Sequence, residues 1–406
     1  MIKVFLLKNI INKNLLANAL NQILGVGFPI IIQFYIIRHL NIEDIGYWGI
    51  FNSSSTLVLL AINFFYIYIL KLISENPDKT ETYLINSVVL AYAMFIIPFA
   101  IYITFLLYNY SFLYQIIIIC SIPIITTPLA MDYYYQANLK NDFIFYRRLF
   151  VKILFVILLF TLVKDSSDFI IYAGISSFTL CLEHFINFYK IRKKIIFKKI
   201  NINSIIEIFK ESISYLPFNL TYNVLPHYSI IIGFYFLDLK TLAIFTILFK
   251  LINLASTFIS SSVMVLFPYK IKSGKNSFND FKYLKNTVLF SLFVIFVFAV
   301  FSKLIFYIFL SDYRMESLKY DFILLSLYIL IHSVYNYLVF NFFLIHDKIY
   351  LVIVTNIIIL LIFLFEILIH IIFEYELKFP LLIIIPVLSG LIILSSIMFY
   401  LKKNTN

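Results

Sequence analysis

Long apolar runs constrain this chain more than any other feature, because each is about as long as a helix that crosses a lipid bilayer. At about 1.5 Å per residue, about 20 apolar residues span the hydrocarbon layer of about 30 Å. Twelve such runs occur in the 406 residues. They are Leu15–Ile37, Trp48–Leu70, Leu84–Leu107, Phe112–Ala130, Ile144–Val163, Phe169–Tyr189, Ile213–Leu237, Leu242–Phe267, Thr287–Leu310, Phe322–Leu344, Tyr350–Phe373 and Phe379–Leu401.

We therefore predict an all-α, polytopic membrane protein with twelve transmembrane helices. A soluble domain is excluded, because 62% of the residues are hydrophobic and only 13% are charged, against about 25% charged in soluble domains. A β-barrel is disfavoured, because the runs lack the alternation of apolar and polar residues that barrel strands need.

The basic residues predict the orientation of the helices. If the N-terminus is cytoplasmic, 24 of the 32 Lys and Arg residues lie in cytoplasmic segments, 7 lie in outer segments, and Lys250 lies within a span. Cytoplasmic loops carry an excess of Lys and Arg, so both termini are predicted to be cytoplasmic. The net charge of +11 lies in loops, which indicates contact with the lipid bilayer rather than with nucleic acid.

The longest connector predicts the domain organisation. It follows the sixth apolar run and is strongly basic. We expect a first six-helix bundle at 1–189, a basic cytoplasmic connector at 190–211 and a second six-helix bundle at 212–406. The connector's basic residues fit control of topology and attraction to anionic lipid, an explanation that we favour over a dedicated partner site.

Lys250 is the residue that points most directly to function. It lies in the middle of the eighth apolar run, about eight residues or about 12 Å below the outer boundary. A cation at such a depth is costly and normally faces a cavity or a substrate path. The competing explanation is a structural ion pair with a membrane carboxylate, for which Glu366 is the candidate of comparable depth.

Other polar residues within the spans extend this prediction. His227 follows Asn223 by four residues, Asn253 follows Lys250 by three, and Arg38 ends the first run. Helical periodicity places residues three or four apart on one face, so we expect these side chains to line a substrate cavity. For any single Asn, a helix–helix hydrogen bond is an equally simple role.

Glu366 and His370 lie four residues apart in the eleventh run. This spacing suits a site for a coupling proton or cation, although His370 also suits a hydrated structural role near the outer interface. No P-loop, zinc-protease or nucleophile-elbow motif occurs, and Cys120 and Cys181 have no metal-type spacing. We therefore predict no metal, no cofactor and no enzyme activity.

Three short stretches resemble a known family. Asp132–Ala137, followed by Arg147 and Arg148, is similar to the D-W-x-x-Q-G…R element of lipid-linked oligosaccharide flippases, with Tyr133 in place of Trp. Arg38-His39-Leu40 with Gly46-Tyr47, and Ala243–Leu251 with Phe267-Pro268, resemble two further elements of that family. These flippases are the Wzx-type O-antigen and capsule translocases of the multidrug/oligosaccharidyl-lipid/polysaccharide (MOP) exporter superfamily.

The resemblance implies a transporter in the bacterial cytoplasmic membrane. Such a transporter carries undecaprenyl-diphosphate-linked oligosaccharide from the inner to the outer leaflet, by alternating access, for surface polysaccharide synthesis. The diphosphate and sugar cavity would hold Lys250, Arg38, His227, Asn223 and Asn253, and the partners would be a polysaccharide polymerase and a chain-length regulator. The alternatives are a cation-coupled drug or metabolite antiporter of the same superfamily and a membrane-embedded glycan polymerase.

Overall fold

The computed structural model describes residues 20–21, 24–25, 27–29, 31–138, 140–195, 199–213, 225–264, 280–310, 318–343, 348–373 and 379–405. All regular secondary structure in these ranges is helical, so the predicted all-α class is confirmed. The chain divides into two compact units. Unit 1 holds residues 1–28 and 39–219, and unit 2 holds residues 29–38 and 220–406. The segment 29–38, which the sequence-based division assigns to the first bundle, groups with unit 2.

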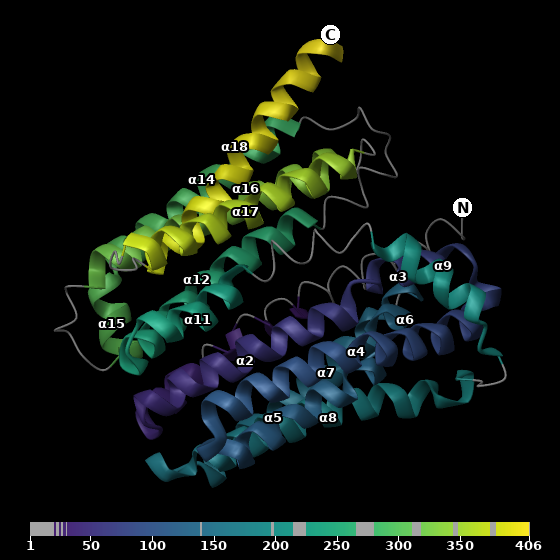
Figure 1. The fold of residues 1–406 in the computed structure, drawn as a ribbon, viewed down its shortest axis with the longest axis horizontal. Coiled ribbons are helices and arrows are strands. Elements are labelled where there is room, and N and C mark those ends of the chain that lie inside the picture. The colour runs from purple at the N-terminus through teal and green to yellow at the C-terminus, as the bar shows by residue number, and fades with distance from the viewer. Residues whose placement is uncertain are drawn as a thin grey trace. The chain divides into compact units, whose positions relative to one another are not determined.

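The described part of unit 1 is a bundle of long helices with three short helices at one end. Its helices are α2 (Ile42–Asn63), α3 (Tyr66–Glu75), α4 (Thr80–Tyr110), α5 (Tyr114–Thr126), α6 (Asp132–Ala137), α7 (Asn141–Leu162), α8 (Phe169–Ile191) and α9 (Ile202–Ser212). The long helices lie side by side in Figure 1, with α2 packed on α4 and α5, and α8 packed on α5 and α7. Because α4 and α7 return the chain, α2, α5 and α8 run in the same direction.

The predicted second span, Trp48–Leu70, is not one helix. It breaks after Asn63, and α3 begins at Tyr66. Phe64 and Phe65 at the break are 1% and 0% exposed, and their rings pack edge to face with centroids 5.5 Å apart. Hydropathy alone does not detect this break, because the two phenylalanines at the turn are as apolar as the residues of the helices on either side.

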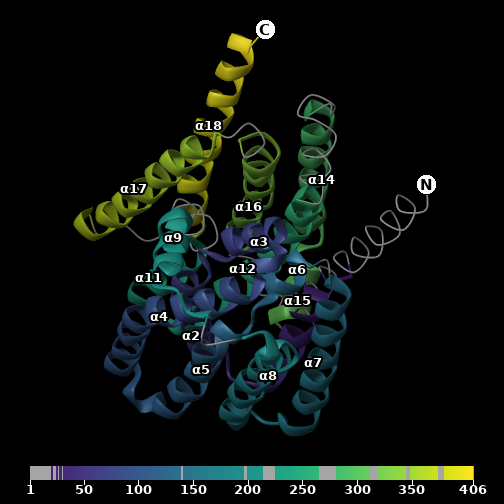
Figure 2. The ribbon, with the colours of Figure 1, turned by 90° about the vertical axis from the view of Figure 1, so that its right-hand side faces the viewer.

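The second half of the predicted basic connector, 190–211, forms the helix α9. The Asn201 side chain accepts a hydrogen bond from the Ser204 N–H and caps the start of α9. The Asn201 N–H in turn donates to the Asn86 side chain on α4 at 3.0 Å. Ile208 is buried, whereas Ile202 and Ile206 are exposed. These contacts fix α9 to α4 and α3, as Figures 1 and 2 show.

Unit 2 also consists of packed helices. They are α11 (Leu225–Phe236), α12 (Leu239–Met264), α14 (Asp280–Val300), α15 (Ser302–Leu310), α16 (Lys319–Leu338), the π-helical turn η9 (Val339–Phe343), α17 (Ile349–Phe373) and α18 (Phe379–Thr405). The central helix is α16, which packs on α12, α14 and α18. Asp238 caps α12 by accepting the Thr241 N–H at 3.1 Å. Hydrogen bonds from the Thr241 side chain and backbone hold the pKa of Asp238 below its usual range.

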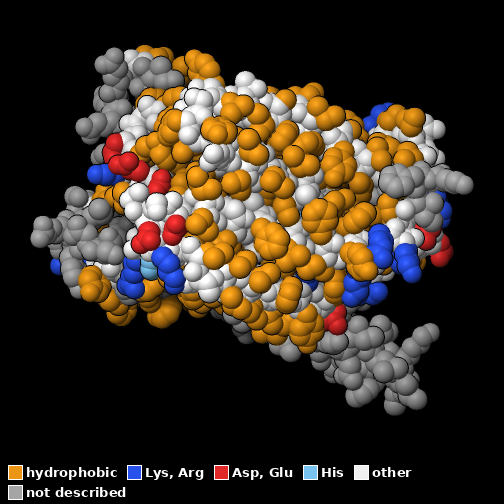
Figure 3. Space-filling view, turned by 90° about the horizontal axis from the view of Figure 1, so that it is seen from below, with side chains coloured by type: hydrophobic (Ala, Val, Ile, Leu, Met, Phe, Trp, Pro, Cys, Tyr) orange, Lys and Arg blue, Asp and Glu red, His pale blue; other side chains and the backbone are white. Residues whose placement is uncertain are grey.

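The surface is that of a membrane protein. Six helical stretches among the described residues are long and apolar enough to cross a bilayer. Large apolar side chains face outward, for example Ile97 at 71% and Phe365 at 62% exposure. In Figure 3, hydrophobic side chains cover the middle of the visible face and charged side chains gather toward its ends. The chain is therefore a multi-pass membrane protein.

Candidate functional site

Lys250 is the central residue of the candidate site in unit 2. It lies in the middle of α12, where Phe249, Leu251 and Ile252 are all buried. The Lys250 Nζ lies 3.5 Å from the Gln33 Oε1, at the long end of the hydrogen-bond range. Gln33 is itself buried, and its Nε2 has no hydrogen-bond partner among the described residues. Among the described residues of its own unit, this ammonium group therefore has one long hydrogen bond and no ion pair.

No described carboxylate neutralises Lys250. The ion pairs found in the described ranges all lie in unit 1. Glu366 does not pair with Lys250, and its buried Oε2 has no hydrogen-bond partner among the described residues. The structural ion pair considered as the competing explanation is therefore not formed. The side chain of His370 lies outside the described part of α17.

The other residues predicted to line the substrate cavity are His227, Asn253, Arg38 and Asn223. His227 on α11 lies within electrostatic range of Lys250. Asn253 lies one turn further along α12, and its Oδ1 accepts from Ser256 at 3.5 Å. Arg38 is exposed, with its guanidinium carbon 3.8 Å from the centre of the Phe34 ring on its own segment. Asn223 lies outside the described residues.

A buried charge cluster in unit 1 was not predicted as a site. The Arg147 side chain is 1% exposed, and its two terminal nitrogens reach Asp132 at 2.8 Å and Glu183 at 2.5 Å. Arg148 adds a contact to Asp132 at 3.0 Å. Asn187 donates to the same carboxylate at 2.8 Å and accepts from Arg147. The cluster joins α6, α7 and α8.

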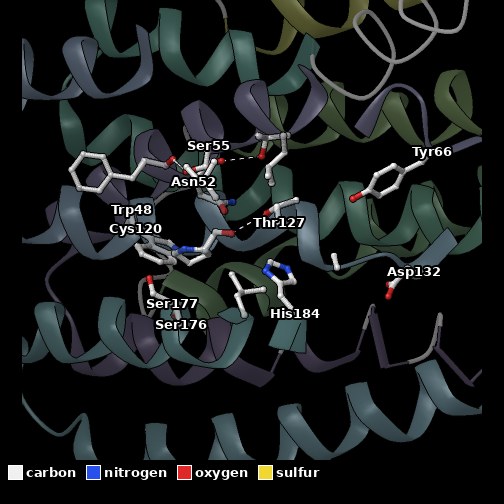
Figure 4. A pocket seen from close by; sticks show the side chains of 17 residues that line it. Trp48, Asn52, Ser55, Tyr66, Cys120, Thr127, Asp132, Ser176, Ser177 and His184 are labelled. Atoms are coloured by element: carbon white, nitrogen blue, oxygen red, sulfur yellow. Dashed lines mark hydrogen bonds between the residues drawn. The ribbon is translucent and has the colours of Figure 1, made fainter. Parts of the chain in front are cut away.

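Unit 1 also contains a cavity of about 310 Å³ between α2, α5 and α8. Figure 4 shows Trp48, Ser176 and Ser177 toward one end, Asn52, Thr127 and His184 in the middle, and Tyr66 and Asp132 toward the other end. No metal-binding group of three His, Cys, Asp or Glu side chains occurs among the residues that the structure describes. The sequence alone does not reveal this cavity, because its walls come from three helices far apart in the chain.

Comparison with known proteins identifies the fold of this chain. No family model matches the chain, and no curated protein matches it. Among solved structures, an inward-facing multidrug resistance MATE family transporter of the MOP superfamily aligns over 94% of both chains, with a TM-score of 0.64 and 12% identity. A MATE protein in complex with MaL6 aligns over 97% of this chain and 94% of that one, with a TM-score of 0.55 and 11% identity. The chain therefore has the all-α, multi-pass membrane fold of MATE transporters of the MOP superfamily.

Proposed function

We propose that this chain exports undecaprenyl-diphosphate-linked oligosaccharide across the bacterial cytoplasmic membrane by alternating access. The likeness to an inward-facing MATE transporter supports a transporter rather than an enzyme. The observation that carries the choice of substrate is Lys250, a part-buried cation in the middle of α12 with no described ion-pair partner. Such a cation needs an anion to offset its desolvation, and the diphosphate of a lipid-linked sugar supplies one.

The physical need for such a protein is large. Each sugar hydroxyl that enters hydrocarbon without a partner costs about 4–8 kcal/mol, so an oligosaccharide with about ten hydroxyls cannot cross unaided. A polar path removes most of this barrier while the lipid tail stays in the bilayer. An inside-negative potential favours outward movement of the anion by about 2.3 kcal/mol per charge per 100 mV.

In this proposal the Lys250 ammonium holds the diphosphate, Gln33 lies beside it at 3.5 Å, and His227 lies within electrostatic range of it. Asn253, Asn223 and Arg38 complete the proposed substrate path, and Glu366 with His370 forms the proposed site for a coupling ion. A polysaccharide polymerase and a chain-length regulator are the proposed partners, because the exported units need assembly into a polymer.

The test is a Lys250→Ala variant in the source bacterium. Truncating one partner of a buried charge pair costs about 2–5 kcal/mol, so we expect export to fall about 30-fold or more. Surface polysaccharide should fall and the lipid-linked precursor should accumulate inside. Lys240→Ala is the matched control, because Lys240 is an exposed cation at the start of the same helix. Normal surface polysaccharide in Lys250→Ala, at an equal protein level, would contradict the proposal.

The second candidate is a cation-coupled drug antiporter. It is favoured by the fold shared with a multidrug resistance transporter and by Glu366, a carboxylate whose buried Oε2 has no described partner. Proton-driven efflux of a cationic dye from proteoliposomes, abolished by Glu366→Gln and retained in Lys250→Ala, would select this candidate over the first.

A further inference from the structure

The cavity between α2, α5 and α8 belongs to unit 1. All of its lining residues belong to unit 1, whereas Lys250 and Gln33 belong to unit 2. On α2 its wall runs from Trp48 to Leu59, a rise of about 17 Å along the helix. Its volume of about 310 Å³ is at the lower end of the range for small-molecule sites. An elongated cavity of this size suits a short chain of small rings better than a single ion.

Several polar groups around the cavity lack a hydrogen bond to any described residue. The Tyr66 hydroxyl is buried and has no hydrogen-bond partner among the described residues, and Figure 4 shows it directed into the cavity. Thr126 holds the His184 Nδ1 at 2.8 Å, and no described residue bonds the His184 Nε2. The Asn52 backbone carbonyl accepts from Thr56, while the Asn52 side-chain amide bonds no described residue. Three groups are thus available to a ligand.

The described lining residues of the cavity offer no free charge. Asp132 is the carboxylate that lines it, and this carboxylate is neutralised by Arg147 and Arg148 at 2.8 and 3.0 Å. A phosphate needs an unpaired cation, and a cationic drug needs an unpaired carboxylate. The lining therefore selects a ligand that is polar but neutral.

An aromatic side chain provides the remaining surface. Trp48 lies toward one end of the cavity, and its ring is held edge to face against Tyr172 with centroids 5.0 Å apart. A flat aromatic ring next to amide, hydroxyl and imidazole groups matches a sugar, which has an apolar ring face and a rim of hydroxyls. A site with few polar groups on an apolar wall fixes the orientation of such a ligand.

We propose that the cavity between α2, α5 and α8 is a glycan-binding groove that holds neutral sugar rings of the transported molecule. This inference rests on the proposed export of lipid-linked oligosaccharide, and it assigns sugar binding to unit 1. Trp48 stacks on a sugar ring, and Asn52, Tyr66 and His184 bond its hydroxyls.

Trp48 is the single tryptophan of the chain, so the tryptophan fluorescence of the protein reports on ligand binding in the groove. We would reconstitute the full-length protein in phosphatidylcholine nanodiscs, since alkyl maltoside detergents carry sugar headgroups. Trp48 emission and its quenching by acrylamide would be followed while maltotriose, chitotriose, inorganic pyrophosphate or tetraphenylphosphonium is added. We expect a saturable change and protection from acrylamide with at least one neutral trisaccharide, and no saturable change with either ion.

Tyr66→Phe provides the sharpest variant. Removing an unpartnered buried hydroxyl should leave thermal stability equal or higher, so a structural role predicts no loss, whereas a sugar-bonding role predicts about five- to tenfold weaker trisaccharide binding. Tyr133→Phe is the control, because the Tyr133 hydroxyl bonds Ser87 at 2.6 Å and does not line the cavity. Tyr133→Phe should lower stability and leave trisaccharide binding unchanged.

The outcomes separate this inference from the proposed function. Lys250→Ala should keep the trisaccharide signal. If this variant also exports polysaccharide normally, the role of Lys250 in binding the diphosphate is wrong, while the glycan-binding groove stands. A response to tetraphenylphosphonium or pyrophosphate in place of the trisaccharides, or no response to any probe, would overturn the groove. Unchanged trisaccharide affinity in Tyr66→Phe would also overturn it.

Discussion

At the scale of single residues, Arg147 is a buried cation whose charge is balanced by ion pairs. Its side chain is 1% exposed and joins Asp132 to Glu183. Removing one partner of a buried ion pair leaves an uncompensated charge and costs about 3–5 kcal/mol. We expect Arg147→Met to lower the free energy of unfolding by about this amount, measured by thermal or denaturant unfolding in detergent.

Arg148 is the matched control for this prediction. It contacts the same two carboxylates, but its side chain is 37% exposed. Exposed ion pairs contribute about 0–1 kcal/mol, so Arg148→Met should cost much less than Arg147→Met. Equal, small losses in the two variants would show that burial of the cluster does not determine its energy.

The sequence predicts single residues of the candidate site better than it predicts the contacts between them. Lys250 stands out from the sequence alone, because a cation in an apolar run is rare whatever surrounds it. Its neighbour Gln33 lies 217 positions away in the chain, and nothing in one sequence links two such positions. Glu183 was missed for the same reason, although an acid near the end of an apolar run that follows a run with Arg147 and Arg148 is a usable signal.

At the scale of elements, α17 and α18 pack closely at Gly390. A Cβ built on Gly390 would lie 2.2 Å from the Ile359 Cδ1 and 2.6 Å from its Cγ1. Overpacking of this kind costs about 1–3 kcal/mol. We expect Gly390→Ala to lower the melting temperature, and Ile359→Val combined with Gly390→Ala to recover part of the loss.

Gly174 on α8 is the control glycine, because nothing lies within 4 Å of a Cβ built there. Alanine is a better helix former than glycine, so Gly174→Ala should be neutral or stabilising. A loss of stability in Gly174→Ala as large as that in Gly390→Ala would rule out the contact with Ile359 as the cause.

Hydropathy predicts helices better than it predicts where they break. The predicted spans Phe169–Tyr189 and Tyr350–Phe373 match α8 (Phe169–Ile191) and α17 (Ile349–Phe373) closely. The breaks at Phe64–Phe65 and at Phe301 were missed, because the residues at both breaks are apolar phenylalanines, and at the first the two rings are buried. The helix α9 was missed because its apolar residues are interleaved with the charges that mark a loop.

At the scale of the whole molecule, the orientation of the helices is open to direct measurement. In a variant with Cys120→Ala and Cys181→Ala, a single cysteine would be introduced as Lys164→Cys or Lys193→Cys. Because the basic residues predict a cytoplasmic N-terminus, a membrane-impermeant maleimide should label position 164 from outside intact cells and position 193 only after permeabilisation. Labelling of position 193 in intact cells would contradict this orientation.

The division of the chain into units has a consequence for any attempt to cut the gene in two. Residues 29–38 belong to unit 2, although nearly all of unit 1 follows them in sequence. A C-terminal fragment beginning after the basic connector would therefore lack Gln33, the side chain that meets Lys250. Chimeras that exchange whole halves between related transporters would likewise pair the Lys250 helix with a foreign first helix.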